Sequence, residues 1–499
     1  MRNSELIFHS EKFNNIIKYR RIKTMAIYDP KSLKAEEFIN HEEIEASLKY
    51  ADENKDNFKL IDEIIEKAKL RKGISHREAS VLLACEDEEK LREIYALAEQ
   101  IKKDFYGDRI VMFAPLYLSN YCVNGCVYCP YHAKNKHICR KKLTQEEVKA
   151  EVIALQDMGH KRLAIESGED PVNNPIEYIL ECIKTIYSIK HKNGAIRRVN
   201  VNIAATTVEN YKKLHDAGIG TYILFQETYH KESYEQLHPT GPKHNYAYHT
   251  EAMDRAMEGG IDDVGLGVLF GLELYRYELA GLLMHAEHLE AVHGVGPHTI
   301  SVPRIQPADD IDPEDFDNGI SDETFAKLIA IIRIAVPYTG MIISTRESAK
   351  VREKALRLGI SQISGGSRTS VGGYVEEEKI EENSAQFDVS DRRTLDEVVR
   401  WLMELGYIPS FCTACYREGR TGDRFMSLCK SGQIQNCCHP NALMTLEEYL
   451  VDYASPETRA IGEKVIAEQL NNIPKEKVKA IAAKYIEEIK NDGKRDFRF

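Results

Sequence analysis

Three cysteines lie close together in the first third of the chain and could bind an iron–sulfur cluster. Cys122, Cys126 and Cys129 are separated by three and then by two residues. Thiolates are the natural ligands of such clusters, and these short spacings allow a backbone to wrap around a cubane. Because a 4Fe–4S cubane has four irons, three cysteines leave one iron open to an outside molecule. A zinc knuckle completed by Cys139 or His132, or plain buried thiols, are the alternatives.

A second set of three cysteines lies near the other end of the chain. Cys412 and Cys415 are separated by two residues, and Cys438 follows after 22 more. This set would again leave one cluster iron without a protein ligand. Pairs with this spacing also bind structural zinc, and His439 or Cys429 would then be the fourth ligand.

The segments that must position these cysteines alternate between strands and helices. Apolar, β-branched runs are typical of strands, and the stretches between them have helical periodicity. Eight alternations predict an α/β fold, a complete (β/α)8 barrel of the TIM type, with a doubly wound open sheet as the alternative. Barrel active sites lie at the carboxyl ends of the strands, where the first cysteine set falls. The predicted strands cover 109–118, 161–166, 198–204, 222–226, 263–270, 298–305, 341–345 and 362–365, and the predicted helices cover 144–158, 175–191, 208–217, 246–258, 275–293, 322–336 and 349–358.

The chain is predicted to have four parts. Residues 1–104 form a mostly helical N-terminal extension and 105–373 form the barrel. An acidic connection at 374–394 then leads to a helical domain at 395–499, which carries the second cysteine set. Met25 is a candidate for the natural start.

Composition narrows the class of protein. The 499 residues carry a formal net charge of -12, so nucleic acid is not an expected partner. No run of eighteen apolar residues occurs and the first 25 residues have no apolar core, which predicts a cytoplasmic protein without a membrane span. Six of the eleven cysteines fall into the two sets, a pattern that indicates metal rather than disulfides.

The first cysteine set resembles the signature of the radical SAM superfamily, in which an aromatic residue, here Tyr128, precedes the last cysteine. The resemblance implies that a 4Fe–4S cluster binds S-adenosylmethionine (SAM) and cleaves it to methionine and a 5′-deoxyadenosyl radical. That radical abstracts hydrogen from the substrate. No side chain is assigned as a catalytic acid, base or nucleophile.

Further segments resemble the SAM-binding parts of that superfamily. The loop after the second strand is similar to its GGE-type motif, whose backbone meets the amino group of SAM. Glycines in the fifth strand would allow adenine or ribose to approach, although tight strand packing explains them equally well. A glutamate at the end of the fourth strand is a candidate polar contact. These expected cofactor-binding residues are Ser167, Gly168, Glu169, Gly265, Gly267 and Glu227.

The second cysteine set is similar to that of the FeFe-hydrogenase maturases of the HydG family. The likeness includes Cys-Thr-Ala-Cys-Tyr-Arg at 412–417, Gly-Arg-Thr-Gly at 419–422 and Cys-His-Pro-Asn-Ala at 438–442. The last segment selects Cys438 rather than its neighbour Cys437 as the third ligand. The resemblance extends over nearly the whole chain from about Met25, including 198–205, 218–230, 238–244 and 296–304.

This resemblance implies a radical SAM carbon–carbon lyase that cleaves L-tyrosine to p-cresol and dehydroglycine. Dehydroglycine then gives carbon monoxide and cyanide at a second 4Fe–4S cluster, which carries an additional iron bridged by free cysteine. An Fe(CO)2(CN) unit leaves for the hydrogenase H-cluster. The implied partners are an electron donor such as ferredoxin or flavodoxin and other hydrogenase maturation proteins.

Three further side chains are expected at these sites. In the family a histidine helps to hold the additional iron, and the prediction here is His285, with His288 as the alternative. Arg304 and Arg346 end the sixth and seventh strands and could clamp the tyrosine carboxylate. Each arginine is equally readable as part of an ion pair at the barrel rim.

Two other functions remain open from the sequence. The chain could be a radical SAM tyrosine lyase that supplies dehydroglycine for thiazole biosynthesis, but that family lacks the second cysteine set. Alternatively it could be a non-catalytic metal-binding scaffold.

Overall fold

Eight parallel strands form a closed barrel in the computed structural model, which describes residues 27–375 and 384–499. Each strand pairs with the next, and the last pairs with the first through Val111 and Gln362. The predicted closed barrel is therefore confirmed, and the open sheet is excluded. The barrel strands are β1 (Arg109–Ser119), β2 (Arg162–Ser167), β5 (Arg198–Asn202), β6 (Tyr222–Ile223), β7 (Val264–Gly267), β8 (Thr299–Ser301), β9 (Gly340–Ile343) and β10 (Gln362–Ser364).

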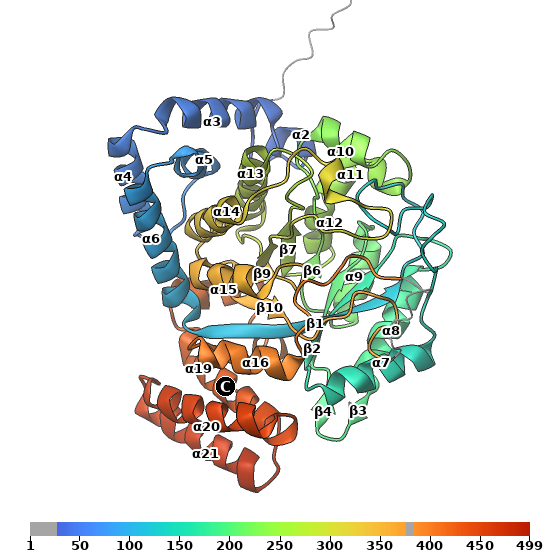
Figure 1. Cartoon of the computed structure of the whole chain (residues 1–499), viewed down its shortest axis with the longest axis vertical. Coiled ribbons are helices and arrows are strands. Elements are labelled where there is room, and N and C mark those ends of the chain that lie inside the picture. The colour runs from blue at the N-terminus through green and yellow to red at the C-terminus, as the bar shows by residue number, and fades with distance from the viewer. Residues whose placement is uncertain (1–26, 376–383) are drawn as a thin grey trace, which may run out of the picture.

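Helices surround the barrel and connect its strands (Figure 1). The first begins at a capping box, in which Thr144 and Glu147 each satisfy the other's backbone N–H, as its sequence predicts. The predicted helix at 246–258 is divided in two at Glu251, whose carboxylate accepts a hydrogen bond from the backbone of Ala35. The surrounding helices are α7 (Gln145–Asp157), α8 (Ile176–Ser188), α9 (Val208–Asp216), α10 (Lys231–Leu237), α11 (Tyr246–Thr250), α12 (Ala252–Glu258), α13 (Tyr275–His293), α14 (Asp322–Ala335) and α15 (Ala349–Leu358), and a small hairpin, β3 (Lys190–His191) with β4 (Gly194–Ala195), follows α8.

The residues before the barrel form helices that pack on its outer layer. They contact α13 and α14, and the last of them leads directly into β1. Buried apolar side chains at helical spacing on α4, such as Ile61, Ile64 and Ile65, explain why that helix packs against α5 and α6. The helices are α2 (Ala35–Phe38), α3 (His41–Asn54), α4 (Phe58–Ala68), α5 (His76–Ala84) and α6 (Glu88–Tyr106).

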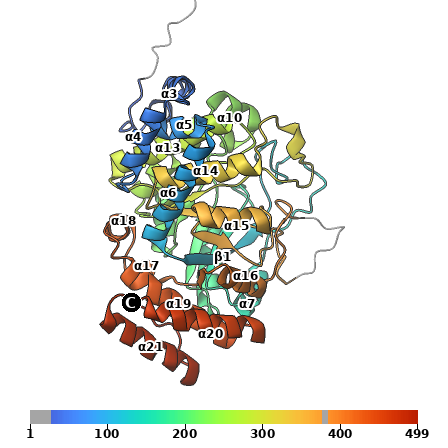
Figure 2. The ribbon, with the colours of Figure 1, turned by 60° about the vertical axis from the view of Figure 1, so that its left-hand side comes forward.

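The residues after the barrel add a ninth strand and a group of helices. Strand β11 (Ile408–Ser410) runs parallel to the first residues of β1. Its three residues include Pro409, and proline is confined to edge strands, so the sequence pattern gave no strand there. The helices lie at the opposite end of the molecule from α2–α5 (Figures 1 and 2). They are α16 (Leu395–Glu404), α17 (Ala414–Arg417), α18 (Gly422–Lys430), α19 (Gln435–Asp452), α20 (Pro456–Asn471) and α21 (Glu476–Asn491).

Two sequence predictions touch residues outside those described. Met25 is one, and residues 376–383 of the acidic connection are the other. The division of the chain into four parts at 104, 373 and 394 stays a prediction. In the described part of the chain, no helix is both long and apolar enough to cross a membrane.

Candidate active site

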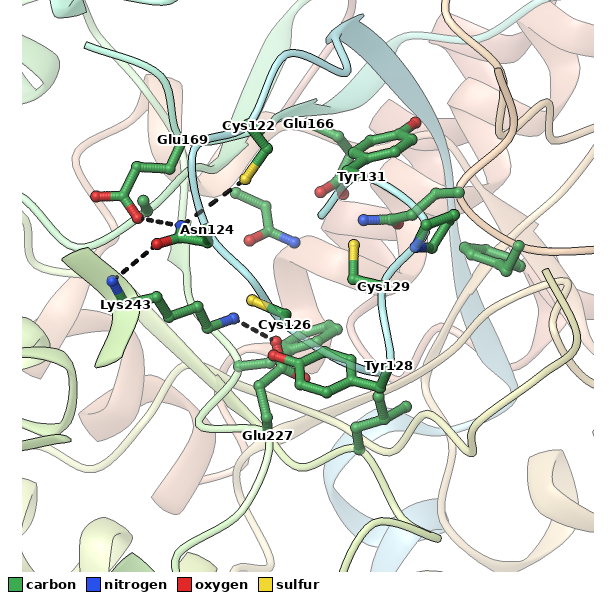
Figure 3. Close-up of a pocket in the computed structure, with 18 of the residues that line it drawn as sticks. Cys122, Asn124, Cys126, Tyr128, Cys129, Tyr131, Glu166, Glu169, Glu227 and Lys243 are labelled. Atoms are coloured by element: carbon green, nitrogen blue, oxygen red, sulfur yellow. Dashed lines mark hydrogen bonds and ion pairs between the residues drawn. The ribbon is translucent and has the colours of Figure 1, made fainter. Parts of the chain in front are cut away.

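The first cysteine set lies at the carboxyl end of β1 and faces one cavity at the mouth of the barrel. Figure 3 shows the thiols of Cys122, Cys126 and Cys129 directed towards a common space. Backbone hydrogen bonds fix the loop between them: Val123 N–H donates to the carbonyl of Glu169 at 2.8 Å and Gly125 N–H to that of Thr240 at 2.9 Å. The loop is thus held by the segments after β2 and α10 as well as by its own strand.

The environment of these thiols suits metal ligation. Burial raises the pKa of all three, that of Cys126 to about 12, so without a positive partner each retains its proton. Lys243 opposes this shift at Cys126. Bound iron would replace those protons, because metals bind the thiolate form. The residues present therefore fit a cluster with three cysteine ligands.

A chain of polar contacts joins the cysteine loop to the opposite wall of the cavity (Figure 3). Lys243 Nζ lies 2.7 Å from Glu227 Oε1, and both side chains are largely buried. Asn124 Nδ2 donates to Glu169 Oε2 at 2.6 Å and reaches Cys122 Sγ at 3.8 Å. Lys243 N–H in turn donates to Asn124 Oδ1 at 3.0 Å, which closes the chain. Sequence reasoning did not single out Lys243 or Asn124, although Lys243 falls in the motif at 238–244.

Four of the six predicted cofactor-binding residues line this cavity: Ser167, Gly168, Glu169 and Glu227. Gly168 is also required by packing, because a Cβ there would meet the carbonyl oxygen of Tyr121 at 2.4 Å. A glycine at this position lets the cysteine loop pass close to the end of β2.

The other two predicted residues lie outside the described lining of the cavity. A Cβ on Gly265 would meet Thr299 Oγ1 at 2.6 Å, and one on Gly267 would meet the ring of Phe225 at 2.4 Å. Close packing of side chains inside the barrel accounts for both glycines. The approach of SAM to these two glycines stays a prediction.

The two arginines predicted to bind the substrate carboxylate have different surroundings. Arg346 lines the cavity, and its guanidinium lies 3.6 Å from the centre of the Phe387 ring. Arg304 instead pairs with Glu347 and lies 2.9 Å from a carboxylate oxygen of Asp322. With its charge already paired at the barrel rim, Arg304 is not retained as a carboxylate ligand.

Glu166, which sequence reasoning left without a role, is a partly buried acid in the same cavity. Burial raises its pKa to about 8, while Arg346 and a hydrogen bond with Asn202 oppose the rise. The cavity continues from these three side chains into the barrel, past Phe113, Ala164 and Ser364. Glu166 thus stands between the cysteine set and the barrel interior.

The second cysteine set lines a different cavity, at the amino ends of the barrel strands. Cys412 follows β11, Cys415 lies on α17 and Cys438 lies on α19. Cys438 lines this cavity and Cys437 is outside its described lining, in agreement with the choice made from the sequence. Cys429 is a fourth thiol in the lining.

Buried cations surround the second set. A hydrogen bond from Cys415 and the nearby Arg109 together lower the pKa of Cys438 to about 6. The Nε atoms of Arg162 and Arg420 are buried without a hydrogen-bond acceptor among the described residues. An anionic sulfide cluster with thiolate ligands fits such a group of donors.

A single metal ion and a cubane cluster require different arrangements of their ligands. Across residues 27–375 and 384–499, no group of three His, Cys, Asp or Glu side chains could hold one metal ion. A cubane does not require its three cysteines to converge on one point, because each binds a different iron.

The histidine in the second cavity is His298, just before β8, and not the predicted His285. His298 Nε2 lies 3.0 Å from Tyr416 Oη, and its Nδ1 lies 3.3 Å from Asp263. His285 lies elsewhere, buried on α13 with its Nδ1 3.0 Å from Tyr229 Oη.

The alternative, His288, contacts Asp254 at 3.0 Å and stacks on Phe38. Both predicted histidines therefore belong to the packing of α13. The signal that marks His298 in the sequence is the segment 296–304, which was noted only as part of the family resemblance.

Comparisons with known proteins agree with this arrangement. Residues 116–279 match the family model described as the radical SAM superfamily, and residues 301–408 match the biotin and thiamin synthesis associated domain. The 2-iminoacetate synthase of Salmonella typhimurium is 27% identical over 347 residues, which are 69% of this chain and 89% of that protein. The Escherichia coli enzyme of the same name is 28% identical over 322 residues, 64% of this chain and 82% of that protein.

Two solved structures are similar over almost the full length. A crystal structure of HydG, described as a maturase of the FeFe-hydrogenase, is 59% identical with a TM-score of 0.89, and the match covers 93% of this chain and 100% of that one. The FeFe-hydrogenase maturase HydG from Carboxydothermus hydrogenoformans is 38% identical with a TM-score of 0.79, over 91% of this chain and 99% of that one. The chain therefore belongs to the HydG family of FeFe-hydrogenase maturases, within the radical SAM superfamily.

Proposed function

We propose that this chain is a tyrosine lyase that cleaves L-tyrosine to p-cresol and dehydroglycine. It then forms carbon monoxide and cyanide, which leave as an Fe(CO)2(CN) unit for the FeFe-hydrogenase H-cluster. The observation that carries the proposal is the pair of three-thiol cavities at opposite ends of one barrel. The relatives named 2-iminoacetate synthase support the first half, because 2-iminoacetate is dehydroglycine.

The first cavity would hold a 4Fe–4S cluster on Cys122, Cys126 and Cys129. Together with SAM, that cluster supplies a 5′-deoxyadenosyl radical. Ser167, Gly168 and Glu169 line the cavity beside the cysteine loop and are proposed to meet the amino acid part of SAM. Glu227, fixed by Lys243, is proposed as a polar contact on the opposite wall.

Tyrosine is proposed to bind deeper in the barrel, below Glu166 and Arg346. Arg346 is partly buried and pairs with no carboxylate among the described residues, so it is free to bind the carboxylate of the substrate. Glu166 holds its proton near neutral pH, because burial raises its pKa to about 8. It would therefore offer a hydrogen bond rather than a negative charge to the amino acid.

The second cavity would hold a second 4Fe–4S cluster on Cys412, Cys415 and Cys438, with an additional iron bridged by free cysteine. When bound, this centre supplies iron that collects the diatomic products. His298 is the side chain proposed to help hold the additional iron, in place of His285, since it shares the cavity with the thiols. Arg109, Arg162 and Arg420 would compensate the negative charge of the cluster. A ferredoxin or flavodoxin as electron donor, other maturation proteins as recipients and a cytoplasmic location remain part of the proposal.

Product analysis tests this proposal directly. The reconstituted chain is incubated with SAM, a reductant and L-tyrosine, and p-cresol, carbon monoxide and cyanide are measured together. All three products are expected. Dehydroglycine and p-cresol without carbon monoxide would instead support supply to thiazole biosynthesis, and zinc without iron in the loaded protein would support a scaffold.

Two variants test the substrate site. Arg346→Gln should raise the KM for tyrosine by about tenfold or more, because a charge-assisted carboxylate contact is lost. Arg304→Gln, at the paired rim arginine, is the matched control and should leave the KM nearly unchanged. An equal change in both variants would contradict the assignment of Arg346.

A further inference from the structure

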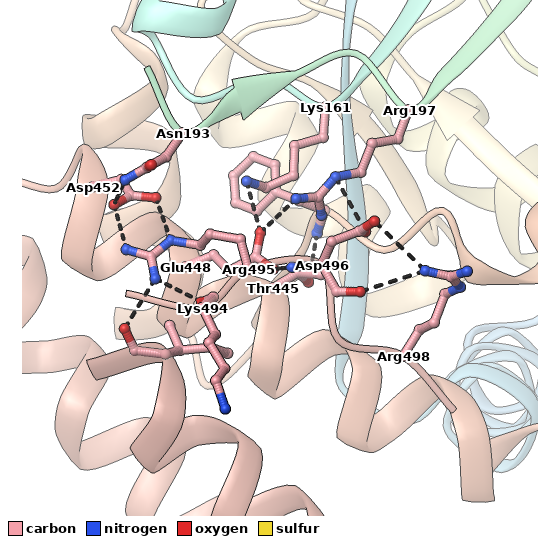
Figure 4. Close-up of polar contacts among 12 residues, drawn as sticks. Lys161, Asn193, Arg197, Thr445, Glu448, Asp452, Lys494, Arg495, Asp496 and Arg498 are labelled. Carbon is pink, nitrogen blue, oxygen red and sulfur yellow. Dashed lines mark hydrogen bonds and ion pairs between the residues drawn. The ribbon is translucent and has the colours of Figure 1, made fainter. Parts of the chain in front are cut away.

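The 495–499 segment, comprising Arg495, Asp496, Phe497, Arg498 and Phe499, lies against the elements that carry the second cysteine set. Asp496 accepts two hydrogen bonds from Arg417, on the helix of Cys415, one of them at 2.6 Å. The same carboxylate lies 3.3 Å from Arg197 Nε and 3.5 Å from Arg498 Nη1. One carboxylate thus joins the cysteine loop to the residue that precedes β5, and Figure 4 shows its contact with Arg197.

The same segment also binds α19, the helix of Cys438. Asp496 N–H donates to Glu448 Oε1 at 2.6 Å, and Arg495 pairs with Asp452 at 2.6 and 2.7 Å (Figure 4). Glu448 is fully buried and also binds Lys161, at 2.9 Å, before β2. The barrel, α19 and the 495–499 segment therefore share one buried carboxylate.

The last contacts reach the second cysteine set itself. Phe499 N–H donates to Asn441 Oδ1 at 2.9 Å, and its main-chain oxygen accepts from Arg420 Nη2 at 2.6 Å. Arg420 is buried, and its backbone N–H donates to the carbonyl oxygen of Cys415 at 2.7 Å. Arg498 pairs with Glu418 in the same loop. Residues 496–499 thus bind the charged side chains of Arg417, Glu418 and Arg420, which follow Cys415 in the chain.

We propose that the 495–499 segment is a latch that positions the second cysteine set, with Asp496 and Arg420 as its positioning residues. Asp496 holds the loop of Cys412 and Cys415 at a set distance from α19, and the contact with Phe499 directs Arg420 towards Cys415. The first cysteine set has no share in these contacts within the described residues. This inference rests on the proposed role of the second cavity as a cluster site.

The backbone of Asp496 makes a sharp test possible. Its φ of 70° is left-handed, a conformation that asparagine and aspartate tolerate better than most residues. Asp496→Asn therefore removes the charge without adding backbone strain. Lys484→Gln, at an exposed lysine 3.7 Å from Glu488 on α21, is the matched control for loss of an ion pair.

The first measurement uses the full-length chain without iron. Iodoacetamide labelling is followed at each cysteine by mass spectrometry. Asp496→Asn should label Cys412, Cys415 and Cys438 about tenfold faster, while Cys122, Cys126 and Cys129 keep their rates. A tenfold change corresponds to about 1.4 kcal/mol of local opening. The thermal unfolding midpoint should stay close to that of Lys484→Gln, which separates positioning from general stability.

The second measurement uses the reconstituted chain with a chelator. Iron bound at the second set, identified by its electron paramagnetic resonance signal in a variant lacking the first three cysteines, should be lost faster in Asp496→Asn. Arg417→Gln should act in the same direction, and the double variant should be less than additive because both ends of one contact are removed.

Each outcome decides one point. Unchanged labelling and iron loss in Asp496→Asn would overturn the latch, while equal changes in both cysteine sets would reduce it to a general stability effect and also overturn it. If the second set of the unaltered chain binds no cluster, the proposed function fails instead, and the labelling experiment still tests the latch by itself.

Discussion

The two cysteine sets of this chain are built in contrasting ways. The first lies within one loop of eight residues that follows directly from β1. The second is brought together from a loop after β11 and a helix more than twenty residues later, and arginines of the barrel complete it. A local site is specified by short spacing along the chain, whereas an assembled site depends on how separate elements pack. The first should therefore tolerate changes elsewhere that the second does not.

Cys126→Ser gives the largest effect expected. It removes one of the three proposed cluster ligands from the local site, so SAM cleavage and all tyrosine-derived products should fall to background. Methionine, 5′-deoxyadenosine and p-cresol, measured by chromatography, check this. Near-normal SAM cleavage would show that the first set is not the site of that reaction.

Cys415→Ser should separate the two sites. Carbon monoxide release is expected to collapse, because a proposed cluster ligand of the assembled site is lost, while p-cresol formation remains partly intact. Parallel measurement of both products is the check. Equal loss of both would refute the division of labour between the two cavities.

His298→Ala tests which histidine belongs to the assembled site. It should lower the additional iron bound at the second set and reduce carbon monoxide more than p-cresol. His285→Ala is the comparison, and it should act on stability, because a buried imidazole and its bond with Tyr229 are lost. A larger loss of carbon monoxide in His285→Ala would restore the assignment made from the sequence.

Glu166→Gln should produce the smallest effect, a change in how stability depends on pH. In the folded chain the pKa of Glu166 is about 8, above its ordinary value of 4.5, so the folded state binds this proton more tightly. Its contribution to stability is complete below about pH 4.5 and is lost as the pH rises through 8, by up to about 1.4 kcal/mol per pH unit. The variant stays neutral, so its unfolding free energy in the iron-free chain should fall less between pH 6 and 8.5. Identical slopes would contradict a buried acid at this position.

Local patterns in the sequence predicted the local features well. The barrel followed from eight alternations, and the loop of Cys122 followed from its spacing, because each depends on neighbours in the chain. Strand β11 was missed, because its three residues include Pro409 and are too few to show the alternation of apolar and polar residues that is typical of a strand. His298 was missed for a related reason: the second cavity brings it to the thiols only through packing.

Two of the predicted site residues, Arg304 and His285, already have partners within the fold. Arg304 and His285 have side-chain chemistry suited to a site, but Glu347 and Tyr229 already engage them. A single sequence does not reveal which partner a polar side chain will meet across the fold.

The length of strand β1 sets the distance between the two thiol sets. Val111 pairs with Ser410, two residues before Cys412, whereas Ser119 lies three residues before Cys122. The eight residue steps from Val111 to Ser119 span roughly 26 Å at about 3.3 Å per residue. Any fragment that passes from one cavity to the other must cover that distance. Inserting two residues into β1 would lengthen the distance by about 7 Å without changing any cysteine.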